Sequence, residues 1–183
     1  MRTLIADPTL LDATLATLEP GVTADVGWTR EYSDPSTGSL WQLTHLLSHL
    51  QGGGYRCLIR MPMPTRAGLI AILCDSNAPD EVWAAGILLQ HDPESYPELL
   101  DALQQMARVG DWARVRRGIT ASGIASGMNR RAHVGQTVAE IGCDAAHFAA
   151  LAERSRELAT QARAALGPDA RSTADRVASP WAG

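Results

Sequence analysis

Residues 66–110 read RAGLIAILCDSNAPDEVWAAGILLQHDPESYPELLDALQQMARVG, and this stretch decides the fold class. Apolar residues recur with helical spacing, and turns that contain Asp, Pro or Gly separate one segment from the next. The pattern predicts helices over 66–74, 79–90 and 94–109. The middle one is apolar around most of its circumference, so we expect it to be central. A string of short amphipathic helices forms a surface for another molecule, which favours binding over catalysis.

On the N-terminal side, Asp7 and Pro8 predict the start of a helix that ends before Pro20-Gly21. Leucines at positions 40, 43, 46, 47 and 50 share one face of a helix and predict one over 40–50. The alternation over 26–33 suits a strand or an extended loop. Residues 55–61 suit a strand or the start of the next helix, and these two stretches together give a small β-hairpin.

On the C-terminal side, Trp112, Val115 and Ile119 continue the helical pattern. A short helix is expected over 134–141, followed by a last helix that Asp144 caps and that runs to Leu166. We therefore expect a mostly α-helical fold, a bundle or a short array of antiparallel helical hairpins. It forms a single domain over 1–167, and 168–183 form a flexible C-terminal tail.

The composition is that of an ordinary globular protein, with 45% hydrophobic and 20% charged residues. There are 16 Lys+Arg, all of them arginine, against 20 Asp+Glu, which gives a formal net charge of -4. A mildly acidic chain has no general attraction for nucleic acid or for an anionic membrane. We therefore expect neither as a partner.

The cysteines and the N-terminal residues indicate a cytoplasmic protein. Cys57, Cys74 and Cys143 lie far apart, and their odd number and spacing fit neither a disulfide framework nor a structural zinc site. We expect buried thiols in a reducing compartment. The opening MRTLIADPTLL is a poor secretory signal, and no run approaches the ~18 apolar residues of a membrane span.

Residues 76–105, SNAPDEVWAAGILLQHDPESYPELLDALQQ, resemble a HEAT- or armadillo-type helical hairpin in the turn, the Val-Trp-Ala-Ala run and the second helix. This resemblance implies a helical scaffold that binds another macromolecule along one face. In size, compartment and acidic charge the chain also resembles small bacterial immunity proteins, which block a cognate toxin. That resemblance implies a toxin as the partner.

Five carboxylates near two turns of the array are the candidate partner-binding residues. On neighbouring turns they form an acidic rim that suits a basic partner. The alternative is that they cap helices and stabilise first turns, which favours an isolated carboxylate at such positions. The five residues are Asp75, Asp80, Glu81, Asp92 and Glu94.

His45 and His49 are the candidate metal ligands, because a spacing of four places both imidazoles on one face of the expected 40–50 helix. The sequence WQLTHLLSHL resembles the metal-binding helix of DinB-like four-helix bundles. That resemblance implies a metal-dependent enzyme, although no motif places a third ligand. The alternative reading is that both histidines flank the core.

No nucleophile elbow, Walker loop or dinucleotide fingerprint occurs. We therefore expect a non-enzymatic protein without a cofactor that occludes a toxin or another basic partner. A metal-dependent enzyme that uses His45 and His49 is the alternative. A third reading is a subunit that forms homo-oligomers through the helix around Trp83.

Overall fold

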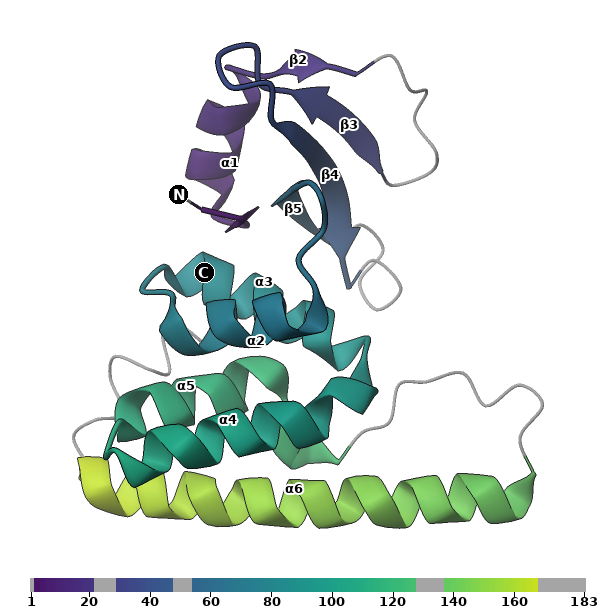
Figure 1. The fold of residues 1–183 in the computed structure, drawn as a ribbon, viewed down its shortest axis with the longest axis vertical. Coiled ribbons are helices and arrows are strands. Elements are labelled where there is room, and N and C mark those ends of the chain that lie inside the picture. The colour runs from purple at the N-terminus through teal and green to yellow at the C-terminus, as the bar shows by residue number, and fades with distance from the viewer. Residues whose placement is uncertain (1, 22–28, 48–53, 128–136, 168–183) are drawn as a thin grey trace. The chain divides into compact units, whose positions relative to one another are not determined.

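The computed structural model describes residues 2–21, 29–47, 54–127 and 137–167 (Figure 1). Within these ranges 62% of the residues are helical, and one antiparallel sheet is present. The prediction of a mostly helical chain is thus confirmed, whereas a bundle or hairpin array stays a prediction. The chain divides into two compact units, residues 1–68 and 69–183. The expected single domain stays a prediction, and the expected tail lies outside the described residues.

Unit 1 combines a five-stranded sheet with one helix. The strand order is β1-β5-β4-β3-β2, and every neighbouring pair is antiparallel. In chain order the elements are β1 (Leu4–Ile5), α1 (Pro8–Leu15), β2 (Glu19–Pro20), β3 (Arg30–Ser33), β4 (Leu40–Leu46) and β5 (Tyr55–Arg60). As expected, Asp7 caps α1, since its carboxylate accepts a hydrogen bond of 2.8 Å from the Leu10 amide and Pro8 follows at the first helical position.

The core of unit 1 lies between α1 and one face of the sheet. Tyr32 on β3 pairs with Trp41 on β4, and Leu43 on β4 pairs with Leu58 on β5. Directly paired residues share a face of an antiparallel sheet, so these side chains point to the same side. The buried cluster consists of Ile5, Leu11, Leu18, Tyr32, Trp41 and Leu58, with Leu15 and Leu43 packed against it.

The prediction of a helix over 40–50 is wrong, because residues 40–46 form strand β4. The leucine spacing fits a helix, but in the strand Trp41 is 5% exposed and belongs to the buried cluster of unit 1. Strands β3 and β5 lie where the extended stretches 26–33 and 55–61 were expected. They do not pair with each other, because β4 lies between them and pairs with both. Residues 26–28 and 48–50 lie outside the described ranges.

A hydrogen-bonded turn over 34–39 connects β3 to β4. The Asp34 amide donates to the Ser39 carbonyl at 2.9 Å, and the Gly38 amide donates to the Asp34 carbonyl at 2.8 Å. Gly38 has a φ of 70°, a conformation that glycine adopts without strain. The Asp34 carboxylate accepts hydrogen bonds from the hydroxyls of Ser36 at 2.6 Å and Thr37 at 2.7 Å. These bonds, with one from the Ser36 amide, lower the pKa of Asp34 to about 2.

This turn is expected to make unit 1 less stable in acid. The folded-state pKa of Asp34 lies below its ordinary value of 3.8. The stability that its hydrogen bonds contribute is therefore fully present above pH 4. It is lost as the pH falls through about 2. We expect a carbon-13 NMR titration of the carboxyl to show a midpoint near 2. The Asp34→Asn variant has no carboxyl group to protonate at this position, so it should not lose this part of the stability at low pH. A midpoint at the ordinary value would contradict the prediction.

Unit 2 is helical in all its described elements, and its helices up to residue 122 run close to where the sequence predicts them. Leu73, Val82, Leu89, Leu99 and Leu103 are fully buried in it. Helix α3 buries most of its residues, as its apolar circumference predicts. The elements are α2 (Arg66–Asp75), α3 (Pro79–Gln90), the 3-10 turn η1 (Pro93–Ser95), α4 (Tyr96–Arg108), α5 (Trp112–Ser122), the 3-10 turn η2 (Ile124–Ser126) and α6 (Val138–Leu166).

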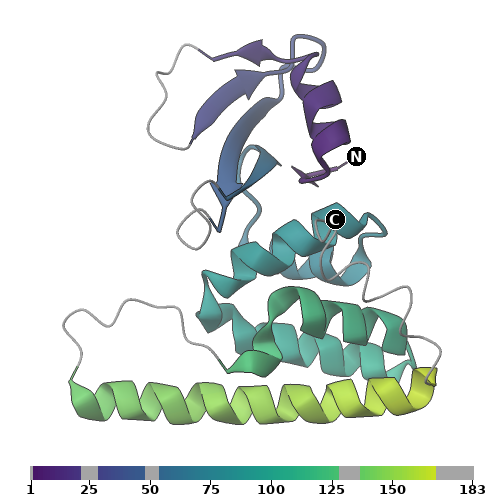
Figure 2. The ribbon, with the colours of Figure 1, turned by 180° about the vertical axis from the view of Figure 1, so that it is seen from behind.

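Helix α5 holds the helices of unit 2 together, since it packs against α3, α4 and α6. Figures 1 and 2, which view the molecule from opposite directions, both show α4 and α5 lying along α6. At the α3–α5 crossing a Cβ added to Gly86 would lie 2.4 Å from the Ala121 carbonyl oxygen. The two backbones can approach so closely only because residue 86 has no side chain.

The last helix is longer than expected. It begins at Val138 and continues through the predicted break at residues 142–144, so both that break and the Asp144 cap are wrong. Its start is set by Thr137. The Thr137 hydroxyl accepts from the Glu140 amide at 3.3 Å, and the Glu140 carboxylate accepts from the Thr137 amide at 2.7 Å. This capping box is visible in the sequence as Thr-Val-Ala-Glu. Residues 134–136 lie outside the described ranges.

Removal of the Thr137 hydroxyl is expected to loosen the first turn of α6. Loss of an N-cap destabilises a helix by about 0.5–2 kcal/mol. In Thr137→Ala we expect faster amide hydrogen exchange over 138–141 and unchanged exchange around Leu158. Thr160→Ala is the matched control, because its hydroxyl only donates back to the Arg156 carbonyl of the same helix at 2.9 Å. Equal exchange in both variants would contradict the role of the cap.

Candidate functional site

The candidate carboxylates lie at two turns of unit 2, but they do not form one exposed rim. Asp75 ends α2 and is exposed, and so is Glu94 in η1. Asp92, which precedes η1, is half-buried. Asp80 and Glu81 in the first turn of α3 are 6% and 7% exposed. Only three of the five can therefore meet a partner at the surface.

Glu81 stabilises the turn between α2 and α3. Its carboxylate accepts a hydrogen bond of 2.7 Å from the Ser76 hydroxyl. That hydroxyl in turn accepts one of 3.1 Å from the Ala78 amide. A carboxylate in the first helical turn also interacts favourably with the helix dipole. Glu81 therefore serves the structure of the turn and of the first turn of α3.

Two further carboxylates, Glu98 and Asp101, lie on the exposed side of α4. They are three residues apart, on the side away from the buried Leu99, Leu100 and Leu103. With Glu94 in the preceding η1, they extend the exposed acidic surface along the helix. Sequence reasoning missed them, although their spacing between the leucine positions is a signal that could have found them.

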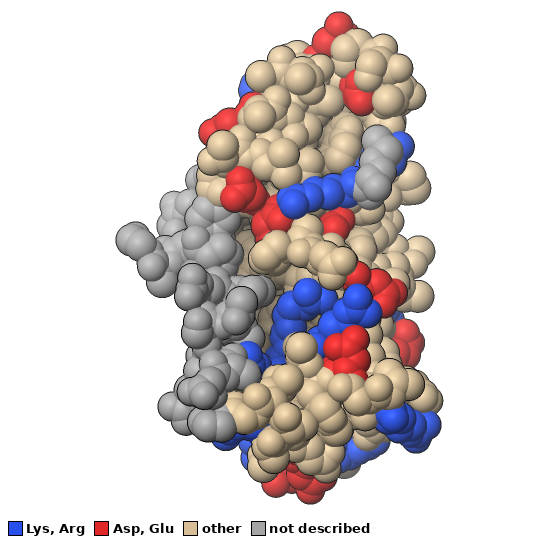
Figure 3. Space-filling model, turned by 90° about the vertical axis from the view of Figure 1, so that its left-hand side faces the viewer, with Lys and Arg blue, Asp and Glu red and all other residues tan. Residues whose placement is uncertain are grey.

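One arginine of α5, Arg117, connects that helix to the end of α2. The Arg117 guanidinium donates to the Cys74 carbonyl at 3.5 Å, and Arg114 lies 3.5 Å from the Asp111 carboxylate. Burial lowers the pKa of Arg117, and the nearby positive charge of Arg114 lowers it further. On the face drawn in Figure 3, arginines (blue) gather beside carboxylates (red). The described part of that face therefore carries charges of both signs.

The three cysteines are free thiols, and two of them are buried as expected. Burial, with a contribution from the Asp75 carboxylate, raises the pKa of the Cys74 thiol to about 11. A thiol with so high a pKa is protonated at neutral pH and therefore unreactive. Cys143 differs from the expectation, since it is exposed on α6.

The proposed pair of histidine ligands depended on a helix that does not form. His45 lies on strand β4 and pairs across the sheet with Arg56 on β5. His49 lies outside the described residues, so metal binding by the pair stays an untested prediction. Within the described ranges no three His, Cys, Asp or Glu side chains are grouped so that they could hold a metal ion. The helical spacing that suggested the pair is therefore not found at His45, which lies on a strand.

Comparison with known proteins links unit 1 to one family. Residues 13–62 match the family model described as Immunity protein 27. The match covers 50 of the 183 residues, from within α1 to just past β5, and includes β2, β3 and β4. It supports an immunity protein, as the sequence resemblance implied. No curated protein and no solved structure matches the chain.

The match and the candidate carboxylates fall on different parts of the chain. All five carboxylates lie beyond residue 62, the last matched position, so the match itself assigns them no role. The HEAT or armadillo resemblance of 76–105 likewise stays a prediction. In the described part of the chain, no helix is long and apolar enough to cross a membrane.

Proposed function

We propose that this chain is a cytoplasmic immunity protein that binds a toxin and blocks it sterically, without catalysing a reaction. The match of residues 13–62 to the Immunity protein 27 family is the observation that carries the proposal. Those residues lie within a compact unit that has its own buried core. A folded unit with a closed core can present a fixed surface to a partner, which lowers the entropy lost on binding.

The proposed partner is basic, and the exposed carboxylates of unit 2 contact it. Asp75 and Glu94 are exposed and Asp92 is half-buried, on a chain with a formal net charge of -4. Opposite charges across an interface speed association and select the correct partner. In this proposal the buried Asp80 and Glu81 do not touch the partner. Glu81 supports the surface indirectly, because it accepts a hydrogen bond from Ser76 in the turn that follows Asp75.

The experiment that tests the function is capture followed by a growth assay. The full chain, carrying an affinity tag, is expressed in its native host, and co-purifying proteins are identified by mass spectrometry. We expect one stoichiometric basic partner that arrests growth when expressed alone in a laboratory bacterium. Co-expression of this chain should restore growth. Failure to capture a partner, or a partner that is harmless alone, would overturn the proposal.

The role of the carboxylates is tested by charge reversal. We expect Asp75→Lys combined with Glu94→Lys to weaken binding of the captured partner about tenfold or more, because like charges then face each other. Glu153→Lys with Glu157→Lys is the matched control, with the same charge change at exposed positions of α6. It removes only the surface ion pair of Glu153 with Arg156. Unchanged affinity in the first variant would remove these residues from the interface.

A further inference from the structure

The N-terminal part of α6, Val138–His147, is named here the acidic arm, and its side chains are mostly uncovered. Val138 is 88% exposed, and of the rest only Ile141 and Asp144 are half-buried. Figures 1 and 2 show this end of α6 running past the ends of α4 and α5. The capping box at Thr137 fixes the first turn, so the arm is a preformed helix.

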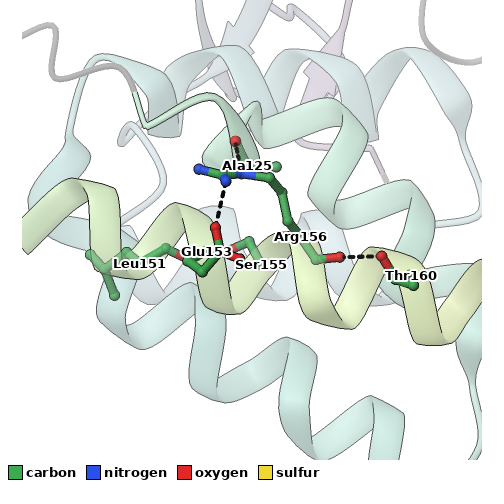
Figure 4. Close-up of polar contacts among 6 residues, drawn as sticks. All are labelled: Ala125, Leu151, Glu153, Ser155, Arg156 and Thr160. Carbon is green, nitrogen blue, oxygen red and sulfur yellow. Dashed lines mark hydrogen bonds and ion pairs between the residues drawn. The ribbon is translucent and has the colours of Figure 1, made fainter.

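The remainder of α6 is anchored, in contrast to the acidic arm. Phe148 and Leu151 are buried, and Phe148 meets the Tyr96 ring edge-on with 6.1 Å between ring centres. Arg156 donates to the Ala125 carbonyl at 3.3 Å and pairs with Glu153 (Figure 4). Anchoring therefore begins at Phe148, where the arm ends.

The acidic arm carries an apolar strip beside a strip of carboxylates. Val138, Ile141 and Ala145 recur at a spacing of three and four residues, which places them along one side of the helix. Glu140 and Asp144 are four apart and form the neighbouring strip. No arginine or lysine occurs from residue 132 to residue 153, so every formal charge on the arm is negative. Helices that dock into protein grooves use this spacing of anchors.

We propose that the acidic arm is a docking helix that enters a groove with an apolar floor and basic walls on a partner protein. Charge complementarity selects this occupant. A second copy paired antiparallel along the arm would bring like carboxylates together, which is unfavourable. An anionic membrane surface would repel them as well. The identification of the partner as the toxin rests on the proposed function, whereas its basic groove follows from the arm alone.

The test uses site-specific photo-crosslinking in the full chain expressed in its host. A photoreactive residue replaces Val138, and the matched control carries it at the exposed Gln161 on the anchored part of α6. We expect Val138, but not Gln161, to capture a basic protein that also binds the pure chain. We expect Asp144→Arg to reduce that capture about tenfold. This variant stays helical because Glu140 can pair with an arginine four residues later. Glu157→Arg, an equal charge change off the arm, should leave capture unchanged.

Other results of the cross-linking would overturn the docking proposal. Capture of a second copy would assign the acidic arm to self-association. Capture of an acidic protein, or of nothing, would show that the arm does not dock on a basic partner.

The docking helix and the proposed immunity function can fail separately. If the captured basic protein is harmless when expressed alone, the docking helix stands and the immunity function falls. If Asp144→Arg still neutralises a toxin fully and Val138 captures nothing, the immunity function stands and the docking helix falls.

Discussion

Gly86→Ala is expected to destabilise unit 2 by about 3 kcal/mol, despite the higher helix propensity of alanine. The new methyl group would lie 2.4 Å from the carbonyl oxygen and 2.5 Å from the carbonyl carbon of Ala121. Both are backbone atoms, so no side chain can turn away and α3 must separate from α5. In thermal unfolding we expect the midpoint to fall by roughly 10 °C.

The same substitution at Gly142 provides the matched control and should have the opposite sign. Gly142 lies within α6, and an added Cβ meets no atom within 4 Å. Replacement of an exposed helical glycine by alanine stabilises by roughly 0.5–1 kcal/mol. Destabilisation by Gly142→Ala, or stabilisation by Gly86→Ala, would contradict the packing described for these helices.

Leu58→Ala is expected to destabilise unit 1 by about 2–5 kcal/mol. Leu58 is fully buried on β5, where it belongs to the cluster with Ile5 and Trp41. Truncation removes apolar contacts and leaves a cavity that the neighbouring strands can close only in part. Urea unfolding of the full chain, followed by the near-ultraviolet signal of its tryptophans, measures the loss.

Leu40→Ala on the neighbouring strand is the control for this effect. Leu40 is 60% exposed at the start of β4, so its truncation should change the stability by less than about 0.5 kcal/mol. Equal losses at the two positions would show that the core of unit 1 does not lie on the side of the sheet that faces α1.

The helices of unit 2 could be predicted because local signals and tertiary packing agree there. Pro79 starts α3, and α4 carries its leucines on one side, so the sequence pattern and the packed structure coincide. Strand β4 could not be predicted from the leucine spacing. That spacing fits a helix, and only pairing with both β3 and β5 makes residues 40–46 extended. Propensity is a weak guide where distant strands complete the hydrogen bonds.

The candidate site was predicted less well than the fold, because exposure depends on packing. Asp80 and Glu81 stand beside Asp75 in the sequence, yet only Asp75 is exposed. The sequence does contain the signal for Glu98 and Asp101, in their spacing against the leucines of α4. It also contains the Thr137 capping box, whereas the glycine at 142 misleads, since one exposed glycine does not interrupt a well-capped helix.

The boundary between the units has a consequence for how such chains can recombine. The units divide between Gly68 and Leu69, but α2 already begins at Arg66. A gene fusion joined at residue 68 would cut the first turn of α2 from the rest of that helix. The family match ends at Pro62, and a second proline follows at position 64. Exchange of the N-terminal module between related genes, by evolution or in the laboratory, is therefore best tolerated at Pro64–Thr65, where no helix is severed.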